Sequence, residues 1–324
     1  MTTTWDSRPE LPDGAPGGPG GFLPPDGGDL HRPQEGFDAL LPRAPWRVWQ
    51  GLAALPVAIV VASIAGLFVF VIAAAFGADM DDTPPAANLA ATLLQDAIFI
   101  GTALVLARVI AYPRRELFGL IRPRGWSALG WTAAAYGTLL VCGAIITAIF
   151  SVDQQDQDDV LDSLGLDQGW GYVVAAGFLV TVAAPLAEEF LFRGFIFQSF
   201  RQRIGTIWGA LASGAMFGAV HITNYEGDGI EVVAASALTL GIFGVVLALL
   251  MAKTGSLLPA IGLHAFNNCI AFGTMQDWDW QIVPLLVGSV GLSLALGALA
   301  IRHWPTPDAA VAPPPDPGGR VAAP

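Results

Sequence analysis

Eight apolar stretches follow one another along the chain, each near the roughly 20 residues that a helix needs to cross the hydrocarbon core of a bilayer. They lie at about 52–76, 87–112, 126–150, 172–200, 207–223, 232–251, 257–272 and 282–301. Backbone polar groups in lipid must be satisfied within the protein, so single apolar stretches of this length fold as helices. The sequence therefore predicts an all-α, polytopic bundle of about eight transmembrane helices.

Composition supports this class and bounds the domains. Hydrophobic residues make up 54% and charged residues 13% of the 324 residues, whereas a soluble domain has about 25% charged residues. Residues 1–45 and 303–324 are polar or rich in Pro and Gly, and we expect disordered tails around a membrane domain at 46–302. A nucleic-acid partner needs a basic face, so the net charge of −12 argues against one.

Charges alternate in sign between successive loops. Arg43 and Arg47 precede the first stretch, and four arginines lie between the second and third, whereas loops such as 153–167 hold almost only acids. The positive-inside rule then places both termini and both tails in the cytoplasm. The richness in Ala, Gly and Pro is compatible with a GC-rich bacterial genome, which would place the chain in a bacterial cell membrane.

A few polar side chains interrupt the apolar stretches. A charge at the centre of a bilayer costs at least about 2.5–3.5 kcal/mol on insertion scales, so such residues are usually functional. They are Asp96, Arg108, Glu188, Glu189, Arg193, His221 and His264, joined by the amide of Asn268.

The two adjacent glutamates divide by helix geometry. Side chains four residues apart are neighbours on a helix, so Glu189 can pair with Arg193 and serve structure. Glu188 is rotated by about 100° and has no counter-ion on its own helix. An unpaired carboxylate in an apolar site suits general acid or base chemistry, so we favour a functional role for Glu188.

Three short motifs on these helices resemble those of the CPBP (CAAX protease and bacteriocin-processing, Abi) family of intramembrane metalloproteases. Residues 188–193 match its Glu-Glu-x-x-x-Arg motif, 217–221 its Phe-x-x-x-His motif, and 264–268 its His-x-x-x-Asn motif. Each motif is weak alone, but three in order are specific. The resemblance covers about residues 172–272, and every motif position is kept.

The resemblance implies hydrolysis of a peptide bond in a membrane-anchored or lipidated substrate, as in the type II endopeptidases that trim prenylated CAAX proteins. Glu188, from the same motif as Glu189, would activate water, and His221 would orient it. His264 and Asn268 would stabilise the oxyanion. Phe217 and Arg193 would support the site.

Two chemistries fit these residues. In the first, His221, His264 and Glu188 bind Zn²⁺, which acidifies a bound water. In the second, no metal takes part: Glu188 is the base and the imidazoles and amide stabilise charge. The sequence leaves both open.

Two other functions remain as alternatives. A non-catalytic immunity or partner protein could use the same scaffold, since a fold does not dictate function. A proton-coupled transporter could use membrane carboxylates such as Asp96 as a relay, but the sequence lacks the repeated halves typical of transporters.

Overall fold

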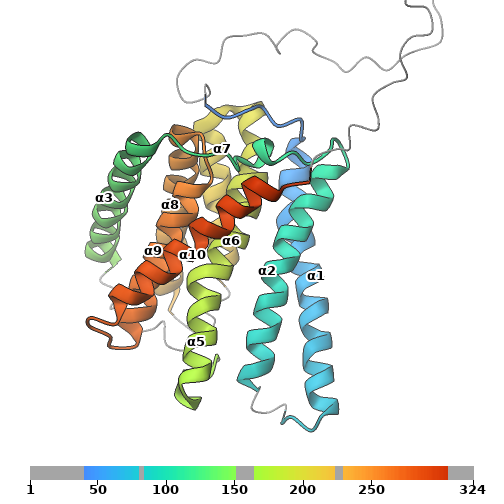
Figure 1. Cartoon of the computed structure of the whole chain (residues 1–324), viewed down its shortest axis with the longest axis vertical. Helices are drawn as coiled ribbons and strands as arrows, with labels where there is room; N and C mark the ends of the chain where they lie inside the picture. Colours follow the sequence, from blue (N-terminus) through green and yellow to red (C-terminus); the bar gives the residue numbers. More distant parts are fainter. Residues whose placement is uncertain (1–39, 80–83, 151–163, 223–228, 306–324) are drawn as a thin grey trace, which may run out of the picture. The chain divides into compact units, whose positions relative to one another are not determined.

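The computed structural model describes residues 40–79, 84–150, 164–222 and 229–305 (Figure 1). These residues form helices and no strands, which confirms the all-α class. The predicted tails lie almost entirely outside the described residues, as does most of the acidic loop 153–167. The separate long helices are α1 (Val48–Ala75), α2 (Pro85–Arg108), α3 (Gly125–Phe150), α8 (Ile230–Thr254), α9 (Leu258–Met275) and α10 (Ile282–His303).

Between α3 and α8, the chain is helical from Trp170 to Val220 except at Gly205. This segment consists of α5 (Trp170–Phe178), the π-helix η5 (Leu179–Ala183), α6 (Ala184–Glu189), the π-helix η6 (Phe190–Phe197) and α7 (Gln198–Val220). The segment holds the fourth and fifth predicted stretches, which are divided by a break at Gly205 (φ +80°). Only a residue without a Cβ adopts that backbone conformation readily.

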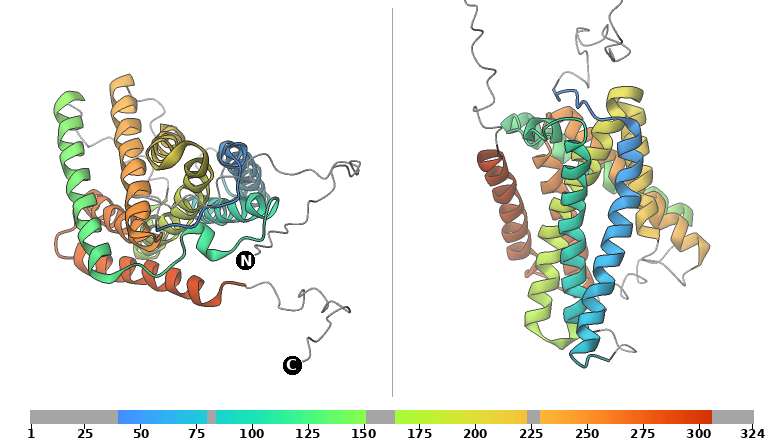
Figure 2. Two further views of the ribbon diagram at one scale, coloured as in Figure 1. Left: turned by 90° about the horizontal axis from the view of Figure 1, so that it is seen from above. Right: turned by 90° about the vertical axis from the view of Figure 1, so that its right-hand side faces the viewer.

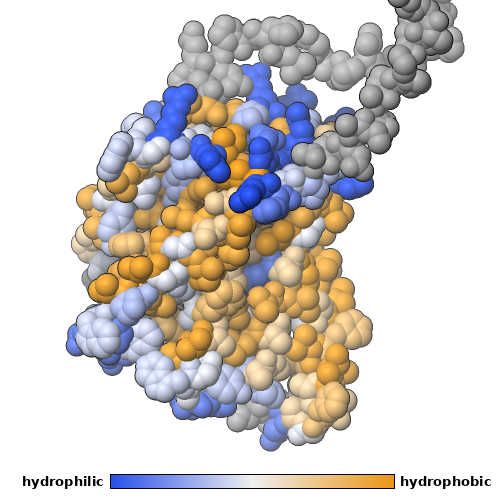
Figure 3. Space-filling model, in the orientation of Figure 1, coloured by the Kyte–Doolittle hydropathy of each residue, from blue (hydrophilic) through white to orange (hydrophobic). Residues whose placement is uncertain are grey.

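Six helices in the described residues are long and apolar enough to cross a membrane. The 51-residue segment counts as one of the six, and α9, which carries the polar side chains of His264 and Asn268, is not among them. Large apolar side chains face outward on these helices: Phe68 on α1 is 63% exposed and Val105 on α2 is 65% exposed. Figure 3 shows such residues covering the middle of the molecule between hydrophilic ends. An apolar surface of this extent needs lipid, so the chain is an integral, multi-pass membrane protein.

Helices that follow one another pack in pairs (Figure 2): α1 with α2, α7 with α8, and α9 with α10. The α7–α8 contact depends on small residues. A Cβ on Gly214 would lie 2.6 Å from the carbonyl oxygen of Gly241, and one on Gly218 would collide with the carbonyl oxygen of Ala237. This is the close approach that glycines four residues apart allow in lipid.

Ordered structure begins before the predicted domain boundary at residue 46. Leu41 and Ala44 are buried, and the guanidinium of Arg201 donates hydrogen bonds to the carbonyl oxygens of Leu41 and Pro42. The last residues before α1 therefore have their backbone oxygens satisfied by the bundle, which a composition argument could not reveal. Which side of the membrane this end faces stays a prediction.

Candidate active site

The helix that carries both glutamates is widened on each side of them. The π-helices η5 and η6 flank α6, whose last two residues are Glu188 and Glu189. In η5 the backbone N–H of Ala184 bonds to the carbonyl oxygen of Leu179, five residues back, instead of that of Val180. Such π-turns inside α-helices occur frequently at functional sites.

This local geometry leaves one carbonyl free, and α9 uses it. In the π pattern, the backbone N–H five residues further on would bond to the Val180 oxygen. That position is Pro185, which has no N–H. Nδ2 of Asn268 donates to that oxygen at 2.9 Å. The amide of the third motif is therefore held against the helix of the first, with one of its two N–H groups already used.

Glu189 is completely buried and lies between two basic groups. Its Oε1 is 2.9 Å from Nη1 of Arg193 and 2.8 Å from Nδ1 of His264. The Arg193 contact is close but is not aligned as a hydrogen bond, and the guanidinium nitrogens have no aligned acceptor among the described residues. The guanidinium carbon instead lies 4.4 Å from the ring centroid of Phe217, in a cation–π arrangement. The pairing that the four-residue spacing predicts is present.

Glu188 is placed differently. Its side chain is 15% exposed, and its Oε2 lies 3.7 Å from Nε2 of His264. That distance allows charge attraction but is too long for a hydrogen bond. His264 therefore contacts both glutamates with different ring nitrogens: Nδ1 is committed to Glu189, and Nε2 faces Glu188 without bonding to it.

His221 lies at the end of α7, beside this group and not in direct contact with it. Its Nδ1 is 2.7 Å from the carbonyl oxygen of Phe217, one turn back. Within the part of the chain that the structure describes, His221 forms no hydrogen bond or ion pair with either glutamate. The Phe217 ring lies between the imidazoles, with centroids 4.6 Å from His221 and 6.0 Å from His264.

Asp96 belongs to this site as well, which the motifs did not indicate. It lies on α2, which packs against α6 and η6, and it is only 4% exposed. It interacts electrostatically with Glu188. The signal in the sequence was its charge in an apolar stretch, but sequence alone could not say which helix it faces.

The predicted zinc ligands do not gather. Among the described residues, no group of three His, Cys, Asp or Glu side chains could hold a metal ion. One nitrogen of each imidazole is bonded within the protein, as in zinc-ligating histidines, so the misfit lies in the three side chains not converging. These residues do not fit a zinc site in this arrangement, and we derive no catalytic step through a metal.

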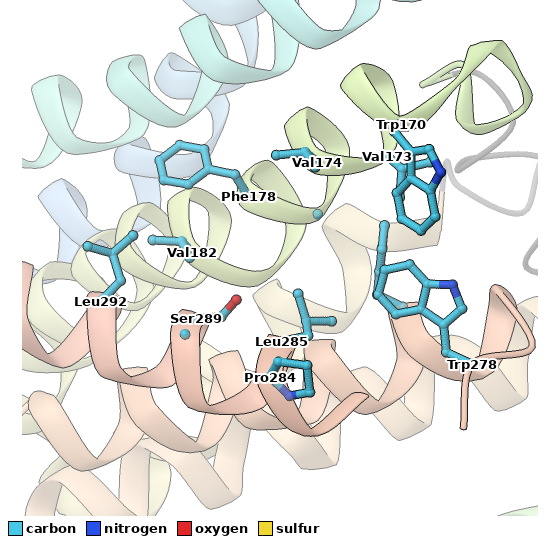
Figure 4. A pocket seen from close by; sticks show the side chains of 13 residues that line it. Trp170, Val173, Val174, Phe178, Val182, Trp278, Pro284, Leu285, Ser289 and Leu292 are labelled. Carbon is cyan, nitrogen blue, oxygen red and sulfur yellow. The ribbon is translucent and has the colours of Figure 1, made fainter. Parts of the chain in front are cut away.

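An apolar pocket of about 250 Å³ lies between α5, η5 and α10, with the end of α9 at one side (Figure 4). The rings of Trp170 and Trp278 stack at one end of it, with centroids 6.3 Å apart. Its one polar lining side chain, Ser289, is hydrogen-bonded to Thr181 at 2.7 Å. None of the six polar residues from the motifs lines it. The pocket and the carboxylate site share the π-helix η5, which supplies Val182 to the pocket and the Val180 oxygen to Asn268.

Comparison with known proteins agrees with the motifs. Residues 170–270 match the family described as type II CAAX prenyl endopeptidase Rce1-like. The chain is also 25% identical over 247 residues to the uncharacterized protein YyaK of Bacillus subtilis (strain 168), across 73% of this chain and 78% of that protein. No solved structure matches it. The resemblance inferred from the motifs is confirmed for this segment.

Proposed function

We propose that this chain, whose residues 170–270 form an Rce1-like type II CAAX endopeptidase core, is an intramembrane endopeptidase that hydrolyses a peptide bond with water activated by Glu188. One observation carries the proposal. Two adjacent glutamates have different surroundings: Glu189 is buried and held by Arg193 and His264, while Glu188 is partly exposed and has no hydrogen bond to His264.

The reaction assigns one task to each group. Glu188 takes a proton from water, and the hydroxide adds to the scissile carbonyl carbon. When the tetrahedral intermediate collapses, Glu188 returns the proton to the departing amine, so the carboxylate is regenerated. General base catalysis of this kind contributes about 10²–10⁴-fold.

The developing oxyanion needs donors, and two are available. Nδ1 of His264 is bonded to Glu189, so Nε2 is the ring nitrogen that faces the Glu188 side of the site, and we assign the oxyanion to it. Asn268 uses one amide hydrogen on Val180 and keeps the second for the oxyanion. His221 would orient the water or substrate from the far side of Phe217. Donors held in place before reaction are effective because they need no reorganisation.

The substrate class follows from the surroundings. A site on membrane-spanning helices receives chains that are themselves in the membrane, so we propose a membrane-anchored or lipidated peptide as substrate and the bilayer as the medium. The apolar pocket beside η5 could hold a hydrocarbon anchor or an apolar side chain of that substrate. A bacterial cell membrane, with both termini in the cytoplasm, is the location we propose, supported by the Bacillus relative.

The test compares peptides from the membranes of cells that carry wild-type protein or Glu188→Gln, which keeps the size and removes the basicity. We expect specific membrane peptides to accumulate uncut in the variant, while its abundance and thermal stability match the wild type. Glu116→Gln is the matched control, because Glu116 lies on the loop helix η2 (Arg115–Phe118) and pairs there with Arg115. Wild-type cleavage by Glu188→Gln would remove Glu188 from the mechanism and favour the non-catalytic partner protein.

A further inference from the structure

Asp96 is a buried carboxylate near the site for which the mechanism above has no role. We propose that Asp96 is a further catalytic residue: its Oδ2 accepts a hydrogen bond from the second O–H of the water that Glu188 activates. The inference rests on the proposed endopeptidase function and adds the group that holds the water in place.

Within the described part of the chain, Asp96 has a carboxylate oxygen that lacks a hydrogen-bond donor. Oδ2 of Asp96 is fully buried and has no hydrogen-bond partner among the described residues. A buried polar group without a partner destabilises the folded state, and a charged one does so more strongly. Such a group persists when a water molecule or a ligand supplies the missing donor.

The charged groups on the helices around Asp96 also support this role. The neighbouring elements present Glu188 and Glu189 from α6 and Arg193 from η6. Arg193 is already paired with Glu189, and the charged group that acts on Asp96 is the like-charged Glu188. Carboxylates that interact across the packed faces of α2 and α6 repel each other. A water molecule that donates one O–H to each satisfies both acceptors and lowers that repulsion.

The chemical step balances with this water. Glu188 removes the proton of the O–H that points to it, and the new O–C bond forms with the electron pair of that oxygen. The remaining O–H still donates to Asp96, so the nucleophile cannot rotate away from the scissile carbon. Fixing a reacting atom in this way lowers the entropic part of the barrier.

Two substitutions separate catalysis from structure. Asp96→Leu removes both acceptors at similar size, and Asp96→Asn keeps one. We expect cleavage of the Glu188-dependent peptides, measured with full-length protein in liposomes, to fall about 100-fold or more in Asp96→Leu, and less in Asp96→Asn. Thermal stability should stay equal or rise in both variants, because each removes the buried carboxylate oxygen that has no partner within the part of the protein that the structure describes. Thr92→Val is the control on the same helix, since the Thr92 hydroxyl donates to the Asn88 oxygen of its own helix.

Each outcome decides between readings. If Glu188→Gln still releases the same peptides as wild type, the endopeptidase proposal fails and the role of Asp96 with it. If Glu188→Gln is inactive but Asp96→Leu cleaves at the wild-type rate, only the role of Asp96 is overturned. If Asp96→Leu loses activity and melting temperature together, and Asp96→Asn does too, Asp96 is a packing residue and the inference is wrong.

Discussion

Nδ1 of His264 lies 2.8 Å from Oε1 of Glu189, so a buried carboxylate of the first motif orients the imidazole of the third. The same oxygen lies 2.9 Å from Nη1 of Arg193. One atom therefore connects the ion pair within one helix to a histidine from another. The geometry of the proposed mechanism should then depend on Glu189, although that mechanism assigns the proton transfer to Glu188.

Loss of either partner of this buried pair should destabilise the bundle. Arg193→Ala leaves Glu189 with one basic neighbour, and Glu189→Gln leaves a buried guanidinium without a counter-ion. Removing one member of a buried pair typically costs about 3–5 kcal/mol. Thermal unfolding in detergent should show a lower melting temperature for each variant, with loss of cleavage. If Arg193→Ala melts like the wild type, the structural role assigned to the pair is wrong.

Asn268 should be needed for the π-helix as well as for catalysis. Asn268→Leu leaves the half-buried Val180 oxygen without a donor, at a cost of up to about 1–3 kcal/mol. Pro185→Ala supplies a backbone N–H that can reach that oxygen, so adding it to Asn268→Leu should restore part of the stability but none of the activity. If the change in stability of the double variant equals the sum of the changes in Asn268→Leu and Pro185→Ala, the new N–H does not replace the Asn268 donor and the prediction is wrong.

The glycines of α7 should tolerate no added carbon. Gly214→Ala places a methyl group 2.6 Å from the Gly241 oxygen, and overpacking of this kind costs about 1–3 kcal/mol. Gly137→Ala on α3 adds the same methyl group where no atom lies within 4 Å. Thermal melts should separate the two variants, with only Gly214→Ala destabilised. Equal melting temperatures would mean that α7 and α8 pack less closely than described.

Filling the apolar pocket should weaken substrate binding. Gly288 lines the pocket, whereas Gly291, nearly one turn further along α10, does not, and a Cβ on either meets no atom within 4 Å. Gly288→Phe should raise KM several-fold with kcat little changed, because the pocket binds substrate without contacting reacting atoms. Gly291→Phe should behave as wild type. Identical KM values for the two variants would show that the substrate does not use the pocket.

Removal of metal should leave cleavage unchanged. Because no three ligand side chains gather among the described residues, we expect purified protein to hold less than stoichiometric zinc and to cleave at the same rate after treatment with a chelator. Elemental analysis and rate measurements check this together. Activity that is lost with a chelator and regained with Zn²⁺ would require His221, His264 and Glu188 to rearrange into a ligand set.

Three short motifs were sufficient for the resemblance of residues 170–270 to the Rce1-like family. Regular patterns in the sequence were sufficient for the helical membrane fold and the Glu189–Arg193 pairing. These depend on the length of apolar runs and on the helix period, both of which are local. The orientation in the membrane also came from such a pattern, and it stays a prediction.

Other features required the tertiary structure. The free oxygen of Val180 arises where a π-turn meets Pro185, and whether it is capped depends on how α9 packs. The proximity of Asp96 to Glu188 depends on how α2 packs against α6. The rotation of α6 and α9 about their axes decides which glutamate meets His264. The imidazole bonds to Glu189 and only approaches Glu188. The helix period predicts which side chains are neighbours within one helix. It does not specify how two helices pack, and the contacts between residues far apart in the chain depend on that packing.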